Sequence, residues 1–297
     1  MGVAAAVLGV LAALGGAALL TRLLEPMLLR ASAEAGPAAQ AAGAQVQHAD
    51  HWVYAAAPLV ALAGVALAML VIPFGPRLIG ADLGIGVFYL LVVVDFVALG
   101  LALGGWGAGS EEAIDVYYRA TAQLVAYVVP IGLAYVGAIM MARSLSTMDI
   151  VARQEGLWYI VTQPIGFALY VVSGLMQCYR PPFSEPFSPH IGGGVLAVFA
   201  GWKALALRLA LDGVLFVVAA MGAVLYLGGW HGPLLPGPVW MLVKTYALMA
   251  LMLWVGTRFR PLSSARMLEL SWKVLTPIGM LNVLVVGVLI LLGVGSR

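Results

Sequence analysis

The chain has 297 residues, of which 63% are apolar and only 9% are charged, with 15 Lys and Arg against 13 Asp and Glu and a net charge of +2. A water-soluble domain carries about 25% charged residues, so this composition excludes a soluble globular protein. The small positive excess is too weak to indicate a nucleic-acid partner. The single cysteine, Cys178, excludes a disulfide framework and a cysteine-ligated iron–sulfur or zinc site within the chain.

The apolar runs predict an all-α polytopic membrane protein with about eight transmembrane helices, since each crossing needs about 20 apolar residues. The predicted spans cover residues 2–20, 53–73, 84–105, 115–142, 157–178, 195–228, 239–257 and 271–294. No positive charge precedes the first run, so we expect a retained span there and not a cleaved signal peptide. Pro130 and Pro277 lie inside apolar runs and predict helix kinks.

We expect one membrane domain over residues 1–297, with an Ala/Gly/Gln-rich linker at 31–50 and a longer loop at 179–194. Most loop cations follow odd-numbered spans, which places those loops in the cytoplasm by the positive-inside rule. Both termini are then non-cytoplasmic, and the 179–194 loop is cytoplasmic. The chain has no internal repeat, which disfavours an inverted-repeat transporter.

Charges within or beside the spans cost about 2.5–3.5 kcal/mol each at a helix centre and mark polar interior paths. They are Asp82 and Asp95 on the third span, Arg208 and Asp212 on the sixth, Lys244 on the seventh, and Glu269 and Lys273 at the start of the eighth.

Two of these pairs, Arg208–Asp212 and Glu269–Lys273, are spaced i,i+4, so each pair shares a helix face and is either a structural ion pair or part of a polar path. Lys244 either belongs to such a path or extends to the membrane surface. Asp95 has no oppositely charged residue on its own helix, so it is a proton-path group or it bonds to another helix.

The segment Gln177-Cys178-Tyr179-Arg180-Pro181-Pro182-Phe183-Ser184-Glu185-Pro186-Phe187 is unlike the rest of the chain. Prolines fix its backbone and aromatic rings flank its two charges. It forms either a wall for an amphipathic ligand or a stiff interfacial turn. The four histidines are scattered without metal-ligand spacing, and no arrangement of Ser, His, Asp or Cys indicates a catalytic group.

Several motifs together give the chain a resemblance to a known family. They are Pro73–Pro76, Ala81–Leu91, Gly104–Trp106, Arg119–Tyr127, Gln163–Phe167, Arg180 with Pro182, Phe183 and Pro186, Leu227–Trp230, Trp240–Lys244, Trp254–Arg258 and Ser271–Pro277. In order and spacing this set resembles the H subunit (ND1-type), a membrane protein of NADH-quinone oxidoreductase, respiratory complex I.

The resemblance implies a multi-pass protein of the cell inner membrane that has no chemistry of its own. It would anchor the redox arm, contribute to a quinone site and help couple quinone reduction to proton translocation. Its implied partners are the peripheral redox arm, antiporter-like membrane subunits and lipid, with flavin and iron–sulfur clusters only in other subunits. Candidate quinone-side residues are Arg180, Pro182, Phe183 and Glu185, and candidate proton-path residues are Asp82, Asp95, Asp212 and Lys244. No metal ligand is expected.

The chain also departs from the family pattern. Val128 stands where the family has an acid after the tyrosine of the fourth span, and Gln177 stands where it has Glu. We therefore expect reduced proton coupling, because few titratable groups remain. Two alternatives stay open: the membrane anchor of a related hydrogenase or formate-oxidising complex, and, with less support, a secondary transporter.

Overall fold

The computed structural model describes residues 15–16, 18–19, 21–23, 50–109, 111–184, 199, 201–233 and 235–293. The expected linker, apart from Asp50, and most of the expected 179–194 loop, including Glu185, lie outside the described residues. The same is true of most of the expected first span.

Every named element in the described part of the chain is helical. The elements are α2 (His51–Met69), α3 (Gly86–Val94), α4 (Phe96–Ala108), α5 (Glu111–Ala142), α6 (Thr147–Ala152), α7 (Tyr159–Thr162), α8 (Pro164–Gln177), α10 (Trp202–Tyr226), α11 (Gly237–Arg258), α12 (Ser264–Leu270), the π-helix η4 (Ser271–Leu275) and α13 (Thr276–Leu291).

Within the described ranges, six helical stretches are long and apolar enough to cross a membrane. They are His51–Met69, Gly86–Ala108, Ala113–Ala142, Trp202–Tyr226, Gly237–Arg258 and Ser264–Leu291, and α8 is a shorter apolar helix. The expected all-α polytopic membrane fold is therefore confirmed. The total of about eight spans and the side of each terminus stay predictions.

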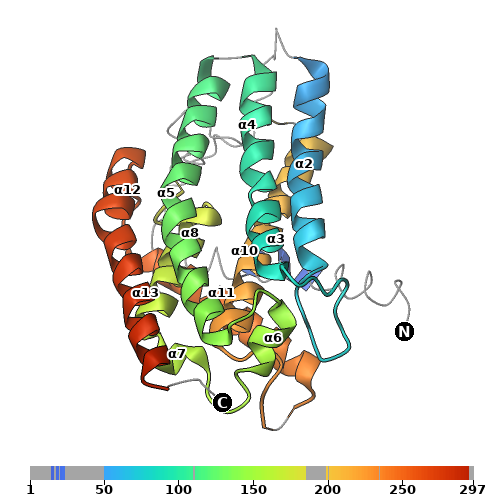
Figure 1. The fold of residues 1–297 in the computed structure, drawn as a ribbon. Coiled ribbons are helices and arrows are strands. Elements are labelled where there is room, and N and C mark those ends of the chain that lie inside the picture. Colours follow the sequence, from blue (N-terminus) through green and yellow to red (C-terminus); the bar gives the residue numbers. More distant parts are fainter. Residues whose placement is uncertain are drawn as a thin grey trace.

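The helices pack around a central one. In Figure 1, α2, α4, α5 and the α12–α13 helix stand in a row, with α8, α10 and α11 behind it. Helix α10 packs against α2, α8 and α11, and 89% of the residues in its most apolar 18-residue stretch are buried. A helix that is hydrophobic all round belongs in such a core.

Small residues set the distance between α2 and α4. A Cβ added at Gly100 would lie 2.7 Å from the carbonyl oxygen of Ala57, and one added at Gly107 would lie 2.7 Å from the amide nitrogen of Tyr54. Membrane helices associate largely through van der Waals packing, because lipid gives no hydrophobic driving force, and small residues let their backbones come close. This contact fixes α4 and thereby the residue that precedes it, Asp95.

Exposed tryptophans mark one end of the bundle. Trp52 is the second residue of α2, Trp106 lies near the end of the antiparallel α4, and Trp202 begins α10; all three are exposed. Lys203 lies 4.0 Å from the ring centre of Tyr54 at the same end. Amphipathic aromatic rings gather at the membrane–water boundary, so this end of the helices lies at a membrane surface.

The structure differs from the expected spans at three places. The third span is interrupted at Asp95, and Asp82 precedes it in an exposed loop. The fifth is broken at Gln163, where α7 ends and α8 begins with a proline. In the eighth, the irregular stretch is the π-helix η4, directly ahead of Pro277. Apolar runs locate the helices in a membrane, but they do not reveal where the regular helical hydrogen bonds are interrupted.

Candidate functional site

Asp95 is the meeting point of three segments of the bundle. It occupies the break between α3 and α4 and is half-buried. Its Oδ1 accepts a hydrogen bond from the hydroxyl of Tyr127 on α5 at 3.0 Å and another from Nε2 of Gln177 on α8 at 3.2 Å. Both donors are neutral and buried. The carboxylate is therefore held by hydrogen bonds that satisfy its oxygen without cancelling its charge.

The short segment after α8 is bound firmly to the bundle. Buried Gln123 of α5 donates through Nε2 to the carbonyl oxygens of Met176 at 2.6 Å and Phe183 at 2.9 Å. The amide of Leu262 donates to the carbonyl of Pro182 at 2.8 Å. Side chain and backbone thus satisfy the polar groups of this segment from two other parts of the chain.

Tyr179 lies at the start of this segment in a left-handed conformation, with φ of 54°. Its side chain is buried, and burial raises the pKa of the Tyr179 hydroxyl above its ordinary value, an effect to which the nearby charge of Asp95 adds. Tyr179 therefore remains a neutral hydroxyl beside the carboxylate.

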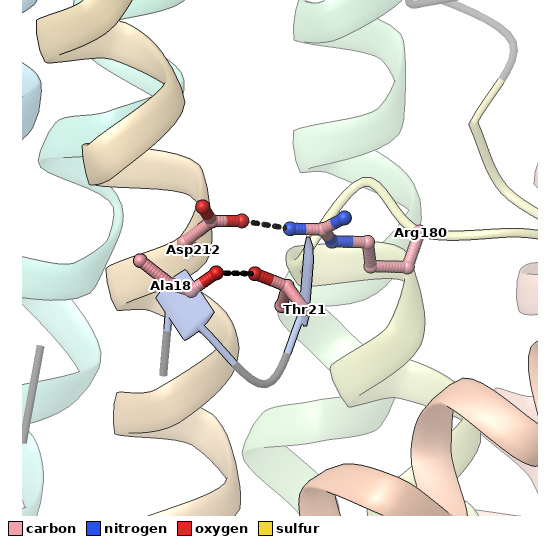
Figure 2. Close-up of polar contacts among 4 residues, drawn as sticks. All are labelled: Ala18, Thr21, Arg180 and Asp212. Carbon is pink, nitrogen blue, oxygen red and sulfur yellow. Dashed lines mark hydrogen bonds and ion pairs between the residues drawn. The ribbon is translucent and has the colours of Figure 1, made fainter. Parts of the chain in front are cut away.

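Arg180 and Asp212 form an ion pair between this segment and α10 (Figure 2). Nη2 of Arg180 lies 2.5 Å from Oδ1 of Asp212, and the two side chains are 12% and 18% exposed. The expected pairing of Asp212 with Arg208, one turn earlier on the same helix, is wrong. Arg208 is exposed, whereas the Asp212 carboxylate faces the segment after α8.

The N-terminal part of the chain reaches the same place. Thr21 is buried, and its hydroxyl donates to the carbonyl of Ala18 at 3.0 Å. Figure 2 shows Ala18 and Thr21 directly below the Arg180–Asp212 pair.

Lys244 does not extend to the membrane surface. It is 6% exposed, and its Nζ donates to the carbonyl oxygens of Leu227 at 2.6 Å, Gly229 at 3.0 Å and His231 at 2.6 Å. Nζ also lies 4.1 Å from the ring centre of Trp158. A cation at a helix C-terminus satisfies carbonyls that lack helical donors and interacts favourably with the helix dipole. Lys244 thus fastens the end of α10.

The other charged candidates lie nearer the surface. The hydroxyl of Ser146 donates to Oδ1 of Asp82 at 3.4 Å, in an exposed loop. Lys273 and Glu269 form the expected i,i+4 pair at 2.9 Å, with side chains 71% and 63% exposed.

Among the described candidate residues, the structure brings together Arg180 and Asp212, with Pro182 and Phe183 in the same segment. Asp95 lies near them through Gln177, three residues before Arg180. Asp82 and Lys244 have different partners. The side chains of Pro182 and Phe183 are buried within the bundle.

Sequence reasoning missed the groups that hold this site. Gln123 and Tyr127 are polar side chains four residues apart on α5; Gln123 binds the end of α8 and the segment after it, and Tyr127 binds Asp95. Their i,i+4 spacing inside an apolar run was the available signal, because it places both on one buried face. The family resemblance marks Gln177 as the position of a Glu, but no pattern indicated its partner Asp95, 82 residues away.

Chemically, the arrangement offers one half-buried carboxylate with neutral donors and an Arg–Asp pair that joins the segment after α8 to α10. A carboxylate of this kind can take up and release a proton.

Comparisons with known proteins identify the family. The sequence pattern described as NADH dehydrogenase matches residues 43–287. The chain is 35% identical to the NADH-quinone oxidoreductase H subunit 2 of Syntrophobacter fumaroxidans over 82% of this chain and 76% of that protein. It is 36% identical to the H subunit 1 of Geobacter metallireducens over 82% and 77%, and 32% identical to the H subunit of Anoxybacillus flavithermus over 80% and 73%. The resemblance drawn from the sequence motifs is confirmed, and the chain belongs to the NADH dehydrogenase family of membrane subunits.

Proposed function

We propose that this chain is the H subunit of an NADH-quinone oxidoreductase, a multi-pass protein of the cell inner membrane that works within a multi-subunit respiratory complex. The observation that carries the proposal is the match to H-subunit proteins over about four-fifths of the chain, which includes the membrane helices. The enzyme activity belongs to the complex. We assign flavin and iron–sulfur clusters to partner subunits; for the clusters the reason is that this chain has one cysteine and it is buried.

The segment at 179–184 is the proposed quinone-side wall. Gln123 and Leu262 donate hydrogen bonds to its backbone, and this fixes the position from which the Arg180 side chain extends. Asp212 orients the guanidinium through their ion pair. In this proposal Arg180 faces the quinone, while Pro182 and Phe183, being buried, support the wall from behind.

Asp95 is the proposed proton-relay group. The family resemblance places acids at 128 and 177, and here those positions hold Val128 and Gln177. Asp95 lies against Gln177 and against Tyr127, the neighbour of Val128. The carboxylate from the α3–α4 break therefore lies beside one of the two positions, Gln177, whereas Val128 is exposed on α5. Asp212 is the second proposed group of this path, at the ion pair with Arg180.

Asp82 and Lys244 have lesser roles in the proposed proton path. Asp82 is exposed ahead of α3, where it is suited to exchange protons with water at the bundle end. Lys244 is engaged by three carbonyl oxygens, so we assign it a structural task in place of proton transfer.

The test is deletion of the gene in its host, followed by expression of a tagged copy and purification from membranes. We expect co-purification with NADH-oxidising and quinone-reducing subunits, and loss of NADH:quinone reductase activity in the deletion strain that the tagged copy restores. Co-purification with a nickel–iron hydrogenase or a formate dehydrogenase would overturn the proposal in favour of the related anchor. Purification without any redox subunit would overturn it in favour of a transporter.

A further inference from the structure

Two buried amide side chains meet where α5, α8 and α13 pack together. Gln163 occupies the break before α8 and Asn282 lies on α13, and they are 1% and 2% exposed. Neither takes part in the Asp95 site. An apolar layer, in which Leu133 of α5 and Leu169 of α8 pack against Gly279 of α13, separates the two amides from the Asp95 site.

Each amide has one unsatisfied polar atom. Nε2 of Gln163 donates to the carbonyl of Gly137 at 3.3 Å, but its Oε1 has no hydrogen-bond partner among the described residues. Nδ2 of Asn282 also has none there. A buried polar group without a partner costs about 1–3 kcal/mol. One atom needs a donor and the other needs an acceptor, so their requirements are complementary.

The two atoms converge beside Gly137 on α5. A Cβ added at Gly137 would lie 2.6 Å from Oε1 of Gln163 and 2.9 Å from Nδ2 of Asn282. A Cβ added at Gly166 on α8 would lie 2.9 Å from the same Nδ2 and 3.2 Å from the hydroxyl of Tyr226. The two unsatisfied atoms therefore lie against the same point beside Gly137, and a side-chain carbon at Gly137 or Gly166 would collide with the amides.

The chemistry of these groups selects the ligand. A metal cation would require several oxygen ligands, whereas here an N–H donor faces the same point as an oxygen acceptor. An anion would require more donors than one carboxamide supplies. Water donates and accepts, and buried waters typically make about three hydrogen bonds to unsatisfied groups.

We propose that Gln163 and Asn282 hold one internal water molecule, which accepts from Nδ2 of Asn282 and donates to Oε1 of Gln163. The hydroxyl of Tyr226 donates to the carbonyl of Ala134 at 2.8 Å and retains lone pairs for the second water proton. The water joins α8 to α13 beside α5. This site stands independently of the proposed function, because it rests on the two amides alone.

The first test is a cryo-electron microscopy map of the assembled complex at a resolution at which ordered waters are visible. The proposal predicts density between Oε1 of Gln163 and Nδ2 of Asn282 at hydrogen-bonding distance from both. Rotated amides bonded directly to each other would overturn it, and so would a gap filled by a side chain with no water density.

The second test uses Gly137→Ala, with Gly132→Ala on the same helix as the matched control. An added Cβ at 132 has no atom within 4 Å, whereas at 137 it meets both amides. We expect the water density to disappear and the melting temperature to fall in Gly137→Ala alone. Retained water density with unchanged melting in Gly137→Ala would contradict the proposal.

Discussion

The hydroxyl of Ser271 donates a hydrogen bond to the backbone carbonyl of Ala126, across the interface between η4 and α5. In an α-helix that carbonyl accepts from the amide four residues later, and here that residue is Pro130, which has no N–H. Ser271 is buried on the π-helix η4 and supplies the missing donor. Ala126 precedes Tyr127, so this bond supports the helix segment that presents Tyr127 to Asp95.

Ser271→Ala should therefore destabilise the protein through Ala126. The buried carbonyl would lose its donor, at a cost of about 1–3 kcal/mol. In a Pro130→Ala background the helix regains its own N–H, and the same change should cost much less. Thermal unfolding of the purified complex for the two single variants and the double variant measures this coupling. Equal costs of Ser271→Ala in both backgrounds would refute the account.

The Arg180–Asp212 pair should show strong coupling between its members. Arg180→Gln leaves the largely buried Asp212 carboxylate without this partner, and removing one member of a buried pair costs about 3–5 kcal/mol. Arg180→Gln with Asp212→Asn should be less destabilised than the sum of the two single changes. Glu269→Gln, in the exposed pair with Lys273, is the control and should change the melting temperature little. Additive effects at Arg180 and Asp212 would count against the pairing.

Lys244→Met should loosen the end of α10. Methionine keeps the apolar stem but removes the ammonium that three carbonyl oxygens accept from, so we expect a loss of about 3 kcal/mol in unfolding free energy. Lys244→Arg should also destabilise, since a planar guanidinium cannot replace a compact ammonium there. Lys203→Met, which removes only a contact with the ring of Tyr54, is the milder comparison. Unfolding curves of Lys244→Met that match those of the unmodified protein would show that the carbonyls do not depend on Lys244.

Cys178 should be unreactive in the folded complex. It is the only cysteine, is 1% exposed, and lies between Gln177 and the bound segment after it. N-ethylmaleimide should modify it only after unfolding in detergent, as mass spectrometry of the intact chain would measure. Leu157→Cys, at an exposed loop position, provides the positive control. Rapid labelling of Cys178 in the folded complex would mean that the 179–184 segment opens.

The membrane helices were predictable because an apolar run of about 20 residues in lipid must satisfy its backbone hydrogen bonds internally, which an α-helix does within one segment. Helices α2, α5 and α11 begin and end within a few residues of the predicted spans. The break at Asp95 was not predictable, since a single polar residue in such a run does not end a helix by its own propensity. The break at Gln163 did have a signal in Pro164, because proline disfavours helical backbone at the residue before it.

The partners of the charged residues depend on packing and were harder to foresee. Asp212 has a cation one turn away on its own helix, yet it pairs with Arg180, 32 residues earlier, because α10 turns that face toward the end of α8. Lys244 binds backbone carbonyls, which carry no signature in side-chain patterns. Glu269 and Lys273 were predictable since helix geometry alone brings them together.

The central claim is that Asp95 relays protons, and Asp95→Asn tests it most directly. Asparagine keeps the size and one acceptor oxygen for Tyr127 and Gln177, but it cannot take up and release a proton. The control is Asp115→Asn, in a half-exposed pair with Arg119 at the start of α5. The measurement is proton translocation and NADH:quinone reductase turnover of the complex in proteoliposomes. The account predicts an assembled Asp95→Asn complex in which proton translocation is lost or falls by about a hundredfold, with Asp115→Asn unaffected. An assembled Asp95→Asn complex that translocates protons at the unmodified rate and ratio would contradict it.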